Sequence, residues 1–384
     1  MNNETLGENM KRKRINIIVL SMSVLILLIC IGVNLVLPYV KPINSGVIWS
    51  DIQVSQEENN LLDFVTKDLM NSDYGIMTNY NDEESQGEIT KGHSVLSESE
   101  GLMLLYYLEA NDKTGFENIL SYVENNMIME NGLLRWRVGG EEETNTSATI
   151  DDLRVVKALL LASEKWNENS YRKTAFKISK GIKRELKDNN LLADFNDGYG
   201  KSSKTQICYL DILALRLIAS LDNDYKDIYT TSLKLLNDAL VSDDLPLYKK
   251  EYDRSTGEFD SENLDMELNS VVLLNRAQAG LDISPTIEFI KKKYYEDNGI
   301  FSIYNLSGEA VSNIESTTIY ANLLQAASLA GDYELYEICR NKIEAYQIKD
   351  DNSLIFGAYG DADTCEVYSF NNLNALLAWR KIKK

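Results

Sequence analysis

The sequence predicts an all-α protein: an (α/α)6 barrel of six helix pairs, preceded by one N-terminal transmembrane helix. Three observations support this prediction. One long uncharged segment lies near the start, a short turn phrase recurs six times, and paired amphipathic patterns lie between the recurrences. Apolar residues make up 44% of the 384 residues and charged residues 26%, so the chain can bury a large core.

The N-terminal segment from Ile15 to Val40 contains no charged residue, and a spanning helix needs about 20 apolar residues. Four basic residues directly precede this segment and only Lys41 directly follows it, which predicts a cytoplasmic N-terminus and an extracellular remainder. A cleaved signal peptide is the alternative, but its apolar core usually has about 7–15 residues. The expected parts are a cytoplasmic tail (1–14), a single-pass cell-membrane anchor (15–40), a linker (41–58) and the barrel domain (59–384).

Net charge and rare residues exclude several functions. The formal net charge is −20, and the first 14 residues carry two acidic and four basic side chains, so the remainder carries −22. Such a surface repels nucleic acid and suits a neutral or cationic partner. A single histidine, His93, argues against a histidine-based metal site and a Ser-His triad. We therefore expect no metal and no cofactor, and any hydrolytic chemistry has to use carboxylates.

The recurring phrase is an acidic or Asn-rich turn followed by Gly, Pro or Leu among apolar residues. Its six instances are spaced 53 to 59 residues apart, at Gly75, Gly132, Leu191, Pro246, Gly299 and Leu354. Spacings of three and four residues between apolar positions predict helix pairs at 152–165 with 170–187, 208–221 with 225–240, and 315–330 with 333–345. Six such units can close into a ring of twelve helices, whereas an open solenoid is the alternative.

Three segments place acidic residues in the first turn of a helix that then becomes apolar: 93–105, 147–166 and 262–272. Capping of the helix start by negative charge explains each segment taken alone. Because the three segments occupy the same place in their repeats, their acids are expected to converge on one mouth of the barrel. Two carboxylates on either side of a scissile bond are what glycoside hydrolysis requires.

These segments resemble glycoside hydrolase family 8, an inverting family on an (α/α)6 barrel. Ser97-Glu98-Ser99-Glu100-Gly101 is similar to the family's general-acid phrase, although two of that phrase's residues, a Gly and a Tyr, are missing. Ala148, Thr149, Asp152 and Trp166 match its second motif, with Ile150 in place of the first Asp. Gly132-Leu133-Leu134-Arg135-Trp136 matches a phrase whose Trp stacks on sugar.

The resemblance implies a role for each residue. Glu98 is the expected general acid and Asp265 the expected base, with Asp260 and Glu267 as alternatives. The sugar-binding carboxylate is Asp151 or Asp152. The other expected substrate-binding residues are Trp136, Arg137, Tyr209 and Glu100. Core packing is the alternative interpretation of Trp136.

The expected function is an extracytoplasmic, endo-acting and inverting hydrolase of a β-1,4-linked glucan or an exopolysaccharide. The expected partners are the polysaccharide and the membrane, with a polysaccharide synthase complex as a candidate and no nucleic acid. A non-catalytic polysaccharide-binding protein on the same barrel is the main alternative. A polysaccharide lyase, a glucuronyl hydrolase or a helical-repeat interaction protein are further alternatives, and the acidic surface argues against uronate substrates.

Overall fold

The structure is a computed structural model that describes residues 3–49, 52–82, 92–139 and 144–382. The chain divides into two units, Met1–Ile43 and Asn44–Lys384. The first unit is built on α1 (Asn3–Val40). Within the described residues, no helix combines the length and the apolarity needed to cross a membrane.

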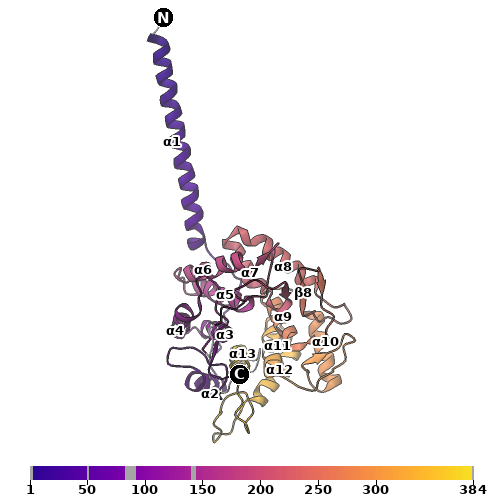
Figure 1. The fold of residues 1–384 in the computed structure, drawn as a ribbon. Helices are drawn as coiled ribbons and strands as arrows, with labels where there is room; N and C mark the ends of the chain where they lie inside the picture. The colour runs from indigo at the N-terminus through magenta and orange to yellow at the C-terminus, as the bar shows by residue number, and fades with distance from the viewer. Residues whose placement is uncertain (1–2, 50–51, 83–91, 140–143, 383–384) are drawn as a thin grey trace. The chain divides into compact units, whose positions relative to one another are not determined.

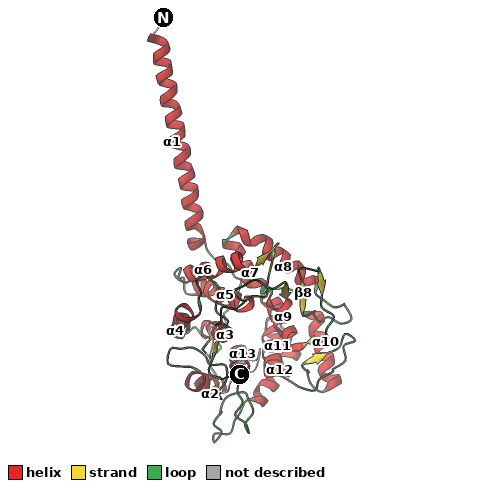
Figure 2. Cartoon of the chain, viewed as in Figure 1, coloured by secondary structure: helices red, strands yellow, loops and turns green. Residues whose placement is uncertain are grey.

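The second unit consists mostly of helices arranged in two rings (Figure 1), and its strands are short (Figure 2). The inner ring contains α3 (Ser97–Glu109), α5 (Thr149–Lys165), α7 (Ile212–Leu221), α9 (Met266–Gln278), α11 (Thr317–Ala330) and α13 (Ser369–Trp379). The outer ring contains α2 (Gln56–Phe64), α4 (Lys113–Tyr122), α6 (Tyr171–Glu185), α8 (Lys226–Asp238), α10 (Ser284–Asp297) and α12 (Tyr333–Tyr346). Single π-helical turns extend α2 (η1, Val65–Leu69) and α4 (η2, Val123–Met127), and short 3-10 turns precede α7 (η3, Ile207–Tyr209) and α8 (η4, Asn223–Tyr225).

The inner ring closes on itself, as the sequence predicted. Each inner helix contacts the next in the order α3, α5, α7, α9, α11, α13, and α13 contacts α3. A buried ion pair links the two ends of this unit: the Arg380 guanidinium after α13 lies 3.2 Å from the Glu58 carboxylate on α2. The hydroxyl of Tyr106 on α3 also donates a hydrogen bond to Glu58, at 3.0 Å. The closed ring excludes the open solenoid.

The inner and outer helices differ in how much of their surface is buried. Inner helix α5 is buried at nearly every position from Thr149 to Ser163, whereas α6 buries one face and exposes a lysine-rich one. Side-chain caps begin several helices: the Asp332 carboxylate accepts the Leu335 N–H at 2.8 Å at the start of α12. At the end of α11, Gly331 adopts a φ of 74°, which a residue without Cβ reaches without strain.

Short antiparallel ladders mark one end of the barrel, called the mouth from here on. The strands are β1 (Val95–Leu96), β2 (Arg137–Val138), β3 (Ser147–Ala148), β4 (Lys187–Asp188), β5 (Leu191–Leu192), β6 (Phe195–Asn196), β7 (Lys204–Gln206), β8 (Glu251–Asp253), β9 (Glu258–Phe259), β10 (Leu264–Asp265) and β11 (Ile303–Tyr304). The pairs are β1 with β2, β3 with β6, β4 with β5 and β10 with β11, and β7, β8 and β9 form one sheet. Because β1, β3 and β10 lead directly into α3, α5 and α9, the ladders bring the starts of those helices to the mouth.

The segment expected as a linker, 41–58, belongs from residue 44 onward to the barrel unit. The Ser45 N–H donates to Glu164 Oε1 at 3.0 Å, and Arg216 Nη2 donates to the Ser45 carbonyl at 2.9 Å. The ammonium of Lys165 lies 4.3 Å from the ring centre of Trp49. The observed boundary therefore lies at residues 43 and 44 rather than at 58 and 59, because these polar contacts fix the segment to the inner helices α5 and α7.

Candidate active site

The inner helices share a common register toward the barrel axis. With the first residue of α3, α5, α9, α11 and α13 counted as position 1, positions 6, 9 and 13 of all five segments line one axial cavity. These positions form a stripe along the axis-facing side of each helix. Position 2 belongs to this stripe, because steps of four, three and four residues from position 2 to 6, 9 and 13 keep side chains on one face of a helix. Position 4 lies about 200° around the helix from position 2 and points away from the axis.

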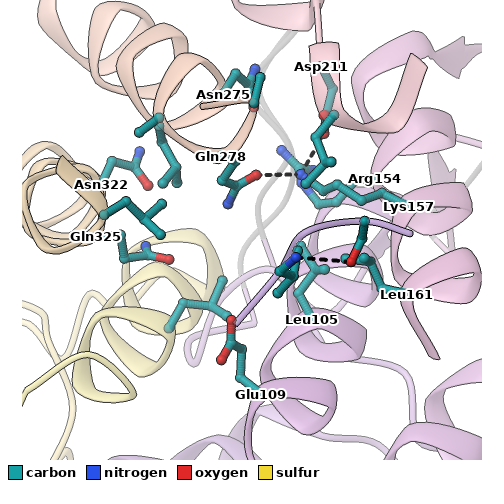
Figure 3. A pocket seen from close by; sticks show the side chains of 18 of the residues that line it. Leu105, Glu109, Arg154, Lys157, Leu161, Asp211, Asn275, Gln278, Asn322 and Gln325 are labelled. Carbon is teal, nitrogen blue, oxygen red and sulfur yellow. Dashed lines mark hydrogen bonds and ion pairs between the residues drawn. The ribbon is translucent and has the colours of Figure 1, made fainter. Parts of the chain in front are cut away.

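The axial cavity has a volume of about 410 Å³ and lies beneath the mouth. Amide side chains of Asn322 and Gln325 face the cations of Arg154 and Lys157 across it (Figure 3). The Lys157 ammonium lies 2.5 Å from the Asp211 carboxylate and donates to Gln278 Oε1 at 2.9 Å. Segment 45–49 lines the cavity beside positions 9 and 13, so the cavity is covered at the end opposite the mouth.

Two carboxylates occupy position 2 on opposite sides of the ring. Glu98 is position 2 of α3 and Glu267 is position 2 of α9. The two helices are three steps apart in either direction around the ring of six. Ile150, Thr318 and Phe370 hold the same position in α5, α11 and α13. Glu98 and Glu267 are therefore directed toward the axis at the mouth from opposite walls.

The environment of Glu98 suits a group that donates a proton near neutral pH. Burial, with a smaller contribution from the charges of Asp151 and Glu267, raises the pKa of Glu98 to about 7. The Arg154 guanidinium acts in the opposite direction and lowers this pKa. A carboxyl group with such a pKa is protonated at pH 6 and can act as a general acid there.

Asp151 is held in place beside Glu98. Its Oδ2 accepts a hydrogen bond from the Ser97 hydroxyl at 2.8 Å, and its Oδ1 accepts one from Arg154 Nη1 at 2.7 Å. Burial raises the pKa of Asp151, whereas Arg154 and Ser97 lower it. The half-buried Tyr209 lies close enough for the charges of Asp151 and Glu98 to raise its phenol pKa, although burial is the larger cause. These four side chains and Glu98 form one cluster.

The segment at the start of α9 holds two carboxylates with different surroundings. Asp265 caps the helix, because its Oδ1 accepts the Leu268 N–H at 3.1 Å, and it lines a separate surface pocket with Ile303. Glu267 accepts a hydrogen bond from the Ser316 hydroxyl. Burial raises the pKa of Glu267, the Ser316 hydrogen bond lowers it, and the charge of Asp265 raises it.

Glu100 and Asp152, two of the residues predicted to bind or process substrate, do not face the barrel axis. Glu100 and Asp152 occupy position 4 of α3 and α5, are fully buried, and accept the backbone N–H groups of Ile76 and Leu134, each at 2.7 Å. Position 4 of α9, α11 and α13 does the same: Asn269, Tyr320 and Asn372 accept the backbone N–H groups of Tyr248, Ile300 and Tyr359 at 2.7, 3.0 and 2.9 Å. These side chains hold the recurring turn phrase, and they face away from the axis.

Trp136 and Arg137, which were predicted to bind substrate, lie at the mouth beside the start of α3. The Ser97 N–H donates to the Trp136 carbonyl at 3.0 Å, and Arg137 pairs with Leu96 in the β1–β2 ladder. Both side chains are half-buried, and the Arg137 guanidinium lies 5.7 Å from the Trp136 ring centre. They are therefore next to α3 and partly accessible. A substrate could stack there on the aromatic face.

Sequence reasoning missed Arg154 and Phe195. Arg154 is the cation that contacts Asp151, and its signal was a lone arginine within an otherwise apolar helix. Phe195 pairs with Ala148 in the β3–β6 ladder beside the start of α5 and is 40% exposed. No motif pointed to Phe195, because its exposure depends on a pairing between segments almost 50 residues apart.

The chain is similar in sequence to one family of glycoside hydrolases and to a Bacillus subtilis protein. A family model described as "Glycosyl hydrolases family 8" matches residues 68–192, which include Glu98 and Asp151. The Bacillus subtilis (strain 168) protein named "Putative lipoprotein YdaJ" is 26% identical over 328 residues, which cover 83% of this chain and 85% of that protein.

Two solved structures share the fold. A protein described as a novel alpha-amylase from Clostridium perfringens is 44% identical with a TM-score of 0.82, and the match covers 85% of this chain and 98% of that one. The family 8 endoglucanase Cel10 from Klebsiella pneumoniae is 14% identical with a TM-score of 0.61, and the match covers 84% of this chain and 98% of that one.

Proposed function

Because the chain belongs to the glycosyl hydrolases of family 8, we propose that it is an extracytoplasmic, membrane-anchored enzyme that hydrolyses a polysaccharide with Glu98 as its general acid. The observation that carries this proposal is the environment of Glu98. It combines an axis-facing position at the mouth with a pKa of about 7, raised chiefly by burial. A half-buried acid beside the half-buried Trp136 is what a hydrolase needs at the leaving-group oxygen.

In the proposed reaction, the Glu98 carboxyl gives its proton to the glycosidic oxygen as the bond from that oxygen to the anomeric carbon breaks. Water attacks the anomeric carbon from the other face and loses a proton to an ionised carboxylate of the segment at the start of α9. The resemblance assigns that base to Asp265, and Glu267 lies two residues away. Asp151, fixed by Arg154 and Ser97, holds the sugar next to the cleaved bond. Separation of acid and base by about 6.5–9.5 Å leaves room for the attacking water and inverts the configuration.

The substrate is proposed to be a neutral glucan or exopolysaccharide that crosses the mouth and is cleaved internally. A net charge of −20 disfavours polyanionic chains. The family resemblance suggests a β-1,4-linked glucan or an exopolysaccharide. The relative at 44% identity is described as an alpha-amylase, so an α-linked glucan stands as a second candidate.

Membrane attachment is supported by the sequence around α1. Ile15 to Val40 carries no charge and follows four basic residues. Large apolar side chains of α1 are also exposed, among them Ile17 at 63% and Leu20 at 66%. With such an attachment the enzyme would act on polymer at the cell surface, and a polysaccharide synthase complex is a candidate partner there. Fractionation of cells and protease digestion of intact cells test it: a soluble protein or a protected barrel would contradict the proposal.

The activity is tested by reducing-end release from amylose, carboxymethyl cellulose, mixed-linkage β-glucan, chitosan and partly deacetylated poly-N-acetylglucosamine. Glu98→Gln is assayed in parallel, with Glu130→Gln as an exposed control. We expect release from one polymer, a loss of about 10²–10⁴-fold in Glu98→Gln, and wild-type activity in the control. Binding of one polymer without release from any would favour the non-catalytic alternative.

A further inference from the structure

We propose that Glu267 is the base that activates the attacking water, that Ser316 positions it, and that Asp265 is a helix cap outside the reaction. This inference rests on the proposed hydrolase function and assigns its second carboxylate. The water gives its proton to Glu267 while its oxygen bonds to the anomeric carbon. Glu98 supplies the proton that leaves with the departing sugar, so each turnover restores both groups after one proton exchange with solvent.

The first argument is position on the helix. Glu98 and Glu267 both occupy position 2, in the stripe whose lower members line the axial cavity. Asp265 precedes the first residue of α9 and is its N-cap, so it is outside that stripe. A base must approach the sugar from the face opposite the acid. Only a side chain on the axis-facing stripe of α9 meets Glu98 from the opposite wall of the ring.

The second argument is occupancy of the carboxylate oxygens. Asp265 accepts the Leu268 N–H through Oδ1, and this hydrogen bond holds the side chain toward its own helix. Glu267 accepts one hydrogen bond through Oε1, from the Ser316 hydroxyl. Among the described residues, Oδ2 of Asp265 and Oε2 of Glu267 both lack a hydrogen-bond partner and are not fully enclosed. The difference is that the Leu268 N–H holds Asp265 toward its own helix, whereas the Ser316 hydroxyl leaves Oε2 of Glu267 available to accept a proton from water on the axis-facing side.

The third argument is electrostatic contact. The charge of Glu267 acts on Glu98 and raises its pKa, whereas Asp265 is not among the groups that shift Glu98. The charge of Asp265 instead raises the pKa of the buried Cys208 thiol, after burial itself. The acid therefore senses Glu267 more strongly than Asp265, as expected for two groups that share one substrate.

Ser316 is fixed by its neighbour in the chain. The adjacent Glu315 carboxylate accepts two hydrogen bonds from the Lys342 ammonium, at 2.7 and 2.9 Å, and one from Tyr346 at 2.9 Å. Tyr320 also donates to Glu315, and its own oxygen accepts the Ile300 N–H. This network fixes the start of α11 to α12, and α11 in turn packs against α9, so the Ser316 hydroxyl is held at Glu267.

The test compares Glu267→Gln with the matched variant Asp265→Asn in the full chain, with amylose and mixed-linkage β-glucan as probes. We expect kcat to fall about 10²–10⁴-fold in Glu267→Gln with KM nearly unchanged, and less than about 10-fold in Asp265→Asn. Sodium azide should partly restore turnover in Glu267→Gln and yield a glycosyl azide of inverted configuration. Loss of activity in Asp265→Asn with retention in Glu267→Gln would overturn the inference. If Glu98→Gln and Glu267→Gln both keep wild-type activity, the proposed function itself is overturned.

Ser316→Ala separates positioning from folding. The Ser316 hydrogen bond lowers the pKa of Glu267, so its removal should move the acidic limb of the pH–rate profile to higher pH. A purely structural serine would lower kcat without moving that limb.

A second measurement needs no substrate. The pKa of Glu98 is obtained from the pH dependence of the stability difference between wild type and Glu98→Gln, and again in the Glu267→Gln background. The pKa of Glu98 should fall when Glu267 loses its charge, and should stay nearly constant when Asp265 does. A larger fall of the Glu98 pKa on removal of the Asp265 charge than on removal of the Glu267 charge would refute the inference that Glu98 and Glu267 face each other.

Discussion

Replacement of the buried Glu100 by glutamine should remove a large part of the pH dependence of stability. Burial raises the pKa of Glu100 from 4.5 to about 8, although the Ile76 N–H lowers it. Its second oxygen, Oε2, is buried without a hydrogen-bond partner in the described part of the chain. Between pH 4.5 and 8 the folded chain therefore holds a proton that the unfolded chain releases.

The sign and size follow from proton linkage. Because the folded pKa lies above the unfolded one, the stabilisation is complete below pH 4.5 and is lost as pH rises toward 8. At about 1.4 kcal/mol per pKa unit, the free energy of unfolding loses about 2–3 kcal/mol between pH 5 and 7, and about 3–4 kcal/mol between pH 5 and 8. The amide that replaces the carboxyl in Glu100→Gln would keep an oxygen for the Ile76 N–H and carry no titrating group.

The assay is urea unfolding of the full chain at pH 5, 6, 7 and 8, followed by tryptophan fluorescence. The stability of Glu100→Gln relative to wild type should increase by about 3–4 kcal/mol from pH 5 to pH 8. The exposed control Glu130→Gln should stay parallel to wild type. Parallel stability curves for Glu100→Gln and wild type would refute the assignment of Glu100 as a neutral, turn-holding side chain.

Other perturbations test the same architecture. Asp152→Ala should lower the free energy of unfolding by about 1–3 kcal/mol, because the buried Leu134 N–H loses its acceptor. Asp152→Asn keeps an oxygen acceptor and should be better tolerated. A loss of kcat of about 100-fold in the stable Asp152→Asn variant would instead place Asp152 in catalysis. Activity should decline above pH 7 as Glu98 loses its proton, and a pH–rate profile flat from pH 6 to 9 would contradict its role as acid. Arg154→Met removes the cation that lowers the pKa of Glu98, so the alkaline limb of the pH–rate profile should move to higher pH. An unchanged limb together with altered stability would show that Arg154 contributes to packing and does not tune Glu98.

The inner helices divide two tasks between neighbouring positions of the same first turn. Position 2 presents a side chain to the axis, and position 4 binds the recurring turn on the opposite side. Acids at both positions are close in sequence, as Glu98 and Glu100 are on α3. Their pKa values are both raised by burial, so an elevated pKa does not distinguish the axis-facing acid from the turn-holding one. Position on the helix does.

Much of the fold was predictable because it is periodic. The recurring turn phrase and the three-and-four spacing of apolar residues predicted six helix pairs, and the observed α5, α6, α8, α11 and α12 begin and end within a few residues of the predicted ranges. The start of the barrel was placed too late, at residue 59 instead of 44. Residues 44–49 have no helical period, and Ser45 is held by contacts with Glu164 and Arg216, which lie more than 100 residues away.

The sequence by itself determined the helix pairs and the acidic first turns, because local periodicity and motif spacing record these features. Glu98 became the candidate acid through the resemblance of residues 97–101 to the family's general-acid phrase. Only the tertiary structure decided which acids face the axis. Asp151 and Asp152 are neighbours, yet one binds Arg154 beside Glu98 and the other binds the Leu134 backbone. A helix turns about 100° per residue, so adjacent carboxylates point to different neighbours. Those neighbours come from distant repeats and are brought together only when the ring closes.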